Sequence, residues 1–201
     1  MKKKFLTFSI NKIKEKGKYS DEKLEEIEYG LETIYLTVTK LIIIFGVAFI
    51  LGIVKETIVL LICYNLIRSS AYGLHASKSI YCLISSLLLF IGGVYVAMYL
   101  SSVPLYIKIV LGLLSIIMII KYAPADTVKR PLINAKKRKR FKIISITKSI
   151  IYLLLIIYFD KMQLSGFLLV GLVEAIIMIH PLVYKIFNLP YNNYKNYDYG
   201  V

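Results

Sequence analysis

Apolar residues gather into six runs along the chain, each close to the ~20 residues that an α-helix needs to cross a bilayer. The second run is the least apolar, because it contains Asn65 and must include Arg68 to reach that length. The pattern predicts an all-α polytopic membrane protein with about six transmembrane helices. In chain order the runs cover residues 34–54, 57–74, 79–100, 103–122, 143–159 and 164–184.

The segments outside the runs are polar and differ in character. Residues 1–30 form a charged arm, whose first 18 residues hold seven lysines against Glu15 and have apolar residues among them. This composition is typical of an amphipathic interfacial segment, although a solvated arm fits it equally well. Ser20 precedes an acidic stretch and is the expected N-cap of a short helix leading into the membrane. We treat the chain as one domain, with a helical bundle at 31–184 and an irregular tail at 185–201.

Composition and charge support a membrane location. The chain is 58% hydrophobic, with a mean hydropathy of +0.68, which is too apolar for a soluble domain of this size. Its net charge of +14 sits in blocks beside the apolar runs, a pattern that indicates membrane topology and anionic lipid contact rather than nucleic-acid binding.

The densest block of positive charge predicts the orientation of the chain. Residues 121–142 carry nine cations against Asp126 alone, and we expect a cytoplasmic basic loop at 123–142. Four apolar runs separate this loop from the basic N-terminus, so both the loop and the N-terminus are expected on the cytoplasmic side. Two more runs follow the loop, which places the C-terminus on the same side. The central basic run consists of Lys136, Lys137, Arg138, Lys139 and Arg140.

Candidate chemistry is concentrated between residues 68 and 82, where His75 and Cys82 stand close in sequence. A cysteine thiolate can attack a carbonyl carbon while an imidazole accepts and returns the proton. On one continuous helix the two residues would lie ~10.5 Å apart along the axis. The pair therefore requires a helix that begins after His75 and a turn before it. Gly73 can adopt the positive φ of such a turn, although a plain helix C-cap explains it equally well.

Neighbouring charges bear on this pair. Arg68 and Lys78 would favour the thiolate, and no acid occurs between residues 57 and 125, so a His–Cys dyad is the economical hypothesis. Glu174, inside the last apolar run, is the one distant acid that could orient His75, and a packing role is the alternative that we favour for it.

The structural alternatives for the same residues are simple. Cys82 can be a small apolar helix residue, and His75 can be a loop residue that reaches the headgroups. Cys63, in the middle of an apolar run, is expected to be purely structural. One histidine and one cysteine seven residues apart lack the paired spacing of zinc ligands, so we expect no metal and no cofactor.

The order of Arg68, the stretch G-L-H-A at 73–76 and Cys82 resembles the catalytic stretch of the accessory gene regulator B family. Two further stretches agree with this resemblance. The sequence Y-A-P-A at 122–125, followed by Lys129, Pro131 and the basic run, is similar to the family's central basic loop, and L-V-G-L-V-E at 169–174 is similar to its last helix. The arm and the tail match only in character.

The resemblance implies a membrane cysteine peptidase of Gram-positive quorum sensing. Such an enzyme cuts an autoinducing pro-peptide on its C-terminal side, holds the N-terminal part as a thioester on Cys82, and closes a thiolactone or a lactone ring. Family substrates carry an acidic C-terminal tail, for which the basic run is a candidate site; topology and anionic lipids alone also explain that run. Homodimer formation is left open.

A transporter or a non-catalytic membrane partner is the alternative function. An expected lack of charge inside the third and fourth runs, together with the absence of an internal repeat, argues against transport.

Overall fold

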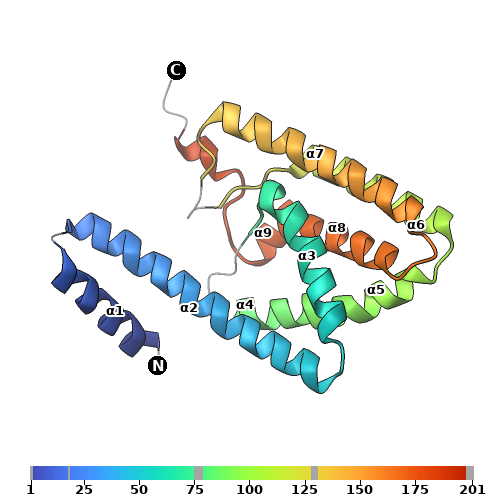
Figure 1. Cartoon of the computed structure of the whole chain (residues 1–201). Helices are drawn as coiled ribbons and strands as arrows, with labels where there is room; N and C mark the ends of the chain where they lie inside the picture. The colour runs from blue at the N-terminus through green and yellow to red at the C-terminus, as the bar shows by residue number, and fades with distance from the viewer. Residues whose placement is uncertain (1, 18, 75–78, 128–130, 198–201) are drawn as a thin grey trace. The chain divides into compact units, whose positions relative to one another are not determined.

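The computed structural model describes residues 2–17, 19–74, 79–127 and 131–197 (Figure 1). These residues form helices and connecting loops, with an isolated parallel β-bridge between Tyr72 and Ala125. The chain divides into two compact units, Met1–Ile50 and Leu51–Val201. Each unit is described by itself.

Unit 1 consists of α1 (Lys2–Lys16) and α2 (Asp21–Ile50). The predicted N-cap is confirmed, because the Ser20 hydroxyl accepts a hydrogen bond from the Lys23 N–H and the Ser20 carbonyl accepts one from the Leu24 N–H. The acidic stretch and the first apolar run form one helix of 30 residues, which is ~45 Å long. The expected short leading helix is therefore the first part of α2.

Unit 2 contains the remaining helices. The third apolar run is one helical rod that passes through α4, a π-helical turn η1 and α5 without a break, and the sixth run is split at His180, which caps α9 by accepting the Leu182 N–H at 3.2 Å. In chain order, the elements are α3 (Val54–Ala71), α4 (Ser79–Leu87), η1 (Leu88–Gly92), α5 (Gly93–Ser101), α6 (Leu105–Tyr122), α7 (Ala135–Tyr158), α8 (Leu164–Ile179), α9 (Pro181–Ile186) and the 3-10 helix η2 (Asn193–Tyr197).

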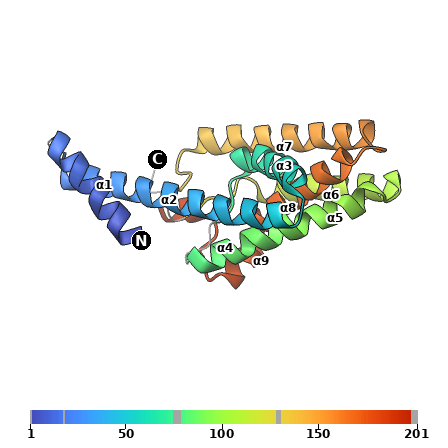
Figure 2. The same cartoon turned by 60° about the horizontal axis from the view of Figure 1, so that its bottom comes forward.

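Helix α8 is the centre of unit 2 and packs against α3, α5, α6 and α7 (Figures 1 and 2). It is buried along most of its length, which explains why it is apolar on all sides. Small residues allow the close packing: a Cβ at Gly171 would lie 2.9 Å from the Cβ of Cys63 and from the backbone nitrogen of Tyr64. Glycine at such contacts is typical of helices packed within a membrane.

The long apolar helices make this an all-α membrane protein, as the sequence predicts. Among the described residues, Lys23–Ile50, Leu83–Ser101, Leu105–Tyr122 and Ala135–Tyr158 are long and apolar enough to cross a bilayer, and α8 is a shorter apolar helix. Helix α3 is not in this set; it carries Lys55, Glu56 and Arg68 within 18 residues. The count of six spans therefore stays a prediction.

The helices of unit 2 give it two ends. The end of α3, the start of α4, the start of α7 and the end of α8 lie toward one end, and the α5–α6 and α7–α8 turns lie at the other (Figure 1). At that other end, the Lys108 ammonium donates hydrogen bonds to Asp160 Oδ1 and to the Ser101 and Asp160 carbonyls, each at 2.8 Å. The expectation that the fourth run carries no interior charge is wrong. Because the acceptors come from both turns, Lys108 joins the two turns.

Candidate active site

The turn after α3 adopts a backbone conformation that few residues accept. Tyr72 has φ 62° and Gly73 has φ 112°, which confirms the positive φ predicted for the glycine. A Cβ at Gly73 would also lie 2.8 Å from the carbonyl oxygen of Met178 in α8. Glycine is therefore required here both by the backbone conformation and by the space available.

Leu74, the residue directly before His75, is held on both of its backbone groups. Its N–H donates to the Met178 carbonyl at 2.9 Å, and its carbonyl accepts from Arg68 Nη2 at 2.8 Å. The Arg68 guanidinium also donates to the Tyr64 hydroxyl. Arg68 thus holds the position at which the chain leaves α3, and its supporting role in catalysis stays a prediction.

His75 lies outside the described residues, as does the side chain of Cys82. The backbone of Cys82 lies in the first turn of α4, which begins at Ser79. A helix start after His75, and contact between the two side chains, stay predictions. Cys63 is 4% exposed within α3, as expected for a structural cysteine.

The Y-A-P-A stretch joins this turn by backbone hydrogen bonds. The Ala125 N–H donates to the Ala71 carbonyl at 3.0 Å, and the Gly73 N–H donates to the Ala125 carbonyl at 2.9 Å. The next residue, Asp126, is 1% exposed, and its backbone carbonyl accepts from the Tyr184 hydroxyl at 3.0 Å. Sequence reasoning treated Asp126 only as the lone acid among cations; that isolation was the available signal for a specific role.

The basic run lies on a helix and not in the predicted loop, which ends before Ala135. Asn134 caps α7 by accepting the Lys137 N–H at 3.1 Å, and lysine and arginine are good helix formers. Helix α7 therefore begins before the apolar run at 143–159, because hydropathy marks where a helix enters lipid and not where it begins. Residue 142 as the cytoplasmic boundary stays a prediction. The Tyr72 and Phe141 rings meet edge to face, with centroids 5.0 Å apart, so the start of α7 adjoins the turn that leads to His75.

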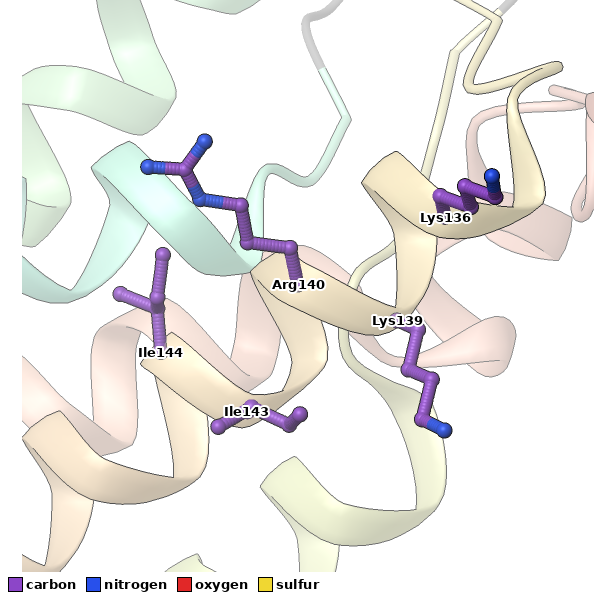
Figure 3. Close-up of a pocket in the computed structure, with 5 residues that line it drawn as sticks. All are labelled: Lys136, Lys139, Arg140, Ile143 and Ile144. Carbon is purple, nitrogen blue, oxygen red and sulfur yellow. The ribbon is translucent and has the colours of Figure 1, made fainter.

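Four of the five cations in the run line two shallow adjoining hollows on α7. The first is drawn in Figure 3, where Lys139 and Arg140 extend in different directions from the helix. Arg138 does not line them. It donates to the Leu132 and Ile133 carbonyls, each at 2.7 Å, and its guanidinium lies 4.0 Å from the centroid of the Tyr194 ring. The hollows are lined by Asn134, Lys136, Lys137, Lys139, Arg140, Phe141, Ile143 and Ile144.

Glu174 lies deep in the bundle. It is 4% exposed, its Oε2 has no hydrogen-bond partner among the described residues, and its carboxyl adjoins Gly93, which the Leu60 side chain also approaches. Gly93 stands eleven residues beyond Cys82 on the same helical rod, a separation of ~16 Å along the axis. This placement supports a packing role between α3, α5 and α8, and a role in orienting His75 stays untested.

Comparison with known proteins shows the family of the chain. Residues 7–179 match the family described as Accessory gene regulator B. The chain is 31% identical to an AgrB-like protein of Clostridium acetobutylicum over 87% of this chain and 83% of the relative, and 30% identical to one of Listeria monocytogenes over 92% and 90%. It is 33% identical to the accessory gene regulator protein B of Staphylococcus aureus over 80% and 84%. No solved structure matches. The chain belongs to the accessory gene regulator B family.

Proposed function

We propose that this protein is a membrane cysteine endopeptidase of an accessory gene regulator quorum-sensing system, acting on a small amphipathic pro-peptide. Membership of the family supports a role in that system. His75 and Cys82 carry the chemistry in this proposal, and no metal or cofactor takes part.

The reaction has two acyl-transfer steps. The Cys82 thiolate attacks the carbonyl carbon of the scissile peptide bond; the carbon–nitrogen bond breaks, and the imidazolium of His75 protonates the leaving amine. The N-terminal part of the peptide is then a thioester on Cys82. A cysteine or serine of that peptide attacks the thioester, so that the ring closes as a thiolactone or lactone and the Cys82 sulfur leaves.

The observation that carries the proposal is the fixed turn before His75. Leu74 is held through its N–H by α8 and through its carbonyl by Arg68, and the described part of α4 begins at Ser79. A fixed turn directly before His75, and the place of Cys82 near the described start of α4, support a dyad. A merely structural cysteine would not require this arrangement.

The four cations in the hollows of α7 support a binding site for the acidic tail of the pro-peptide. Their side chains are exposed, and Phe141 of the same surface contacts Tyr72 of the turn. A tail held there would place the scissile bond near the dyad, and positioning alone lowers a barrier by several kcal/mol. Anionic lipid headgroups compete for the same charges.

Replacement of Cys82 tests the covalent mechanism. Cys82→Ala should abolish cleavage of the pro-peptide, and His75→Ala should lower its rate by ~10²–10⁴-fold, because thiolate formation and leaving-group protonation lose their assistance. The matched control is Cys63→Ala, which removes a buried thiol from α3 and should cleave nearly as well as the native enzyme. Cleavage in a membrane-inserted Cys82→Ala protein would exclude the thioester.

The orientation of the helices is also part of the proposal, with both termini and the basic run on the cytoplasmic face. In a Cys63→Ala/Cys82→Ala background, a cysteine at Lys139 should react with an impermeant thiol reagent only from the cytoplasmic side. A cysteine at Ser102, in the α5–α6 turn, should react only from outside. Labelling of both positions from one face would overturn this orientation.

A further inference from the structure

The carboxylate of Asp126 is buried, and three backbone N–H groups satisfy it. Oδ1 accepts from Asn193 at 2.9 Å, and Oδ2 accepts from Tyr194 at 2.8 Å and from Leu132 at 3.3 Å. A buried charge is stable only when its hydrogen bonds are made. Two of the three donors stand 67 and 68 residues further along the chain. The C-terminal segment, residues 191–197, is therefore bound here by the Asp126 carboxylate.

The same residue adjoins the turn of the candidate active site. Ala125, its immediate neighbour, exchanges backbone hydrogen bonds with Ala71 and Gly73. The Tyr184 hydroxyl donates to the Asp126 carbonyl at 3.0 Å and to the Ala125 carbonyl at 3.4 Å. One peptide unit therefore separates the group that binds the C-terminal segment from the bridge that holds the turn before His75.

The C-terminal segment also contacts the start of α7. The Tyr194 ring lies under the Arg138 guanidinium at 4.0 Å, a cation–π distance. Tyr191 donates from its hydroxyl to the Tyr122 carbonyl at 3.4 Å, and burial raises the pKa of Tyr191 to about 12, so this phenol stays a neutral donor at physiological pH. The segment thus touches the end of α6, the loop and the first turn of α7.

We propose that the C-terminal segment 191–197 is a positioning element of the active site, coupled through Asp126 to the turn that carries His75. The proposal rests on the function proposed above. Asp126 has no role as a reacting group; it acts by fixing Ala125, and through Ala125 the Gly73 backbone. The tail that the sequence predicted to be irregular would then be part of the catalytic apparatus.

The test loosens the contact from each side in the full-length protein. Asp126→Asn replaces one carboxylate oxygen by an amide that cannot accept, so at least one backbone N–H loses its partner. Tyr194→Pro removes both tail-side contacts of residue 194, the N–H donor to Asp126 and the ring under Arg138, and leaves Asp126 intact. Tyr194→Phe keeps the N–H and the ring and is the control for loss of the hydroxyl. We expect Asp126→Asn and Tyr194→Pro each to lower kcat about 10–100-fold with KM changed less than twofold, and Tyr194→Phe to act as the native enzyme.

A second readout separates positioning from general loss of stability. In a Cys63→Ala background, the rate at which iodoacetamide alkylates Cys82 at pH 7 should fall in Asp126→Asn and Tyr194→Pro. Asp160→Asn is the matched control, because it also neutralises a carboxylate that accepts from a buried donor, at the other end of unit 2. It should lower stability and leave alkylation per folded molecule unchanged.

The outcomes are distinct for the two proposals. Inserted Asp126→Asn and Tyr194→Pro proteins with native kcat and native alkylation would overturn the positioning role, as would losses that only parallel those of Asp160→Asn. Cleavage by Cys82→Ala would instead overturn the proposed mechanism. If Asp126→Asn fails to insert, Tyr194→Pro alone decides, since it removes the N–H donor and the ring of residue 194 in the tail and leaves the Asp126 side chain unchanged.

Discussion

Each end of unit 2 has a buried charged side chain that is hydrogen-bonded to backbone groups, and the two charges have opposite sign. At one end the Asp126 carboxylate accepts hydrogen bonds from backbone N–H groups of distant segments. At the other the Lys108 ammonium donates to backbone carbonyls of two turns and to Asp160. Both side chains are 1% exposed. Each links loops or turns that contacts between the helices do not hold together.

What differs is the set of segments that each charge joins. Lys108 joins the α5–α6 and α7–α8 turns, which hold none of the candidate catalytic residues. Asp126 joins the C-terminal segment to a loop that contacts the turn before His75 and the start of the basic helix. A buried, satisfied charge is therefore not by itself a mark of function, and what decides is the chemistry of the segments that it fixes.

Among substitutions outside the dyad, this comparison predicts the largest effect on cleavage for Gly73→Ala, in the turn before His75. In Gly73→Ala, the new Cβ would meet the Met178 carbonyl at 2.8 Å, on a residue with φ 112°. Backbone strain of this kind costs ~1–3 kcal/mol, so we expect kcat/KM to fall about 10–100-fold, measured on purified enzyme in liposomes with a fluorescent pro-peptide.

The control for Gly73→Ala is Gly46→Ala in α2. Nothing lies within 4 Å of a Cβ built there, and alanine is favoured over glycine in a helix interior by ~1 kcal/mol. Cleavage should be unaffected. Native activity in an inserted Gly73→Ala protein would show that the turn tolerates a shift, and the functional half of the comparison would lose its basis.

A smaller effect is expected when charges on α7 are reversed. This change tests recognition of the pro-peptide tail separately from the positioning of the turn before His75. Reversing Lys136, Lys139 and Arg140 to Glu should lower kcat/KM about tenfold, since each exposed pair contributes ~0.2–1 kcal/mol. The effect should weaken with salt. Reversing three acidic residues of the pro-peptide tail should recover part of the loss when both partners are changed together.

The control reverses three lysines of α1, Lys12, Lys14 and Lys16, and should leave kcat/KM unchanged. Normal insertion is checked for both proteins by thiol labelling at Ser102. If the α7 variant inserts correctly and cleaves the native peptide at the native rate, the basic run serves topology and lipid contact alone.

The sequence predicted the parts of this structure that depend on neighbouring residues. The Ser20 cap and the positive φ of Gly73 follow from local steric and hydrogen-bonding rules. Hydropathy placed the apolar helices, but not the start of α7, because Asn134 and a run of good helix formers extend that helix beyond the apolar residues.

Long-range contacts could not be read in the same way. No pattern near Asp126 in sequence predicts that its hydrogen-bond donors lie more than 60 residues away. The tail that supplies these donors has no apolar periodicity from which its packing could be predicted. Lys108 was missed because its position in an apolar run gives no sign of its partner, Asp160, 52 residues further on. For the dyad, spacing set the condition that the turn must meet, and contact between His75 and Cys82 stays a prediction.

The smallest effect on cleavage is expected at the Lys108 end, where the change in stability should be substantial. Lys108→Met keeps much of the side-chain volume and removes the donor, so the Ser101 and Asp160 carbonyls and the Ser165 hydroxyl lose a partner. An unsatisfied buried acceptor costs ~1–3 kcal/mol, and the midpoint of unfolding in sodium dodecyl sulfate should fall accordingly. Cleavage per folded molecule should stay within twofold of native, because the altered turns lie at the end of unit 2 away from Gly73.

Adding Asp160→Asn to Lys108→Met should lower the free energy of unfolding by less than Asp160→Asn does alone, since the carboxylate has then already lost its cation. A large fall in kcat per folded molecule would instead mean that α8 transmits changes along the bundle, and the two ends could not be treated as separate.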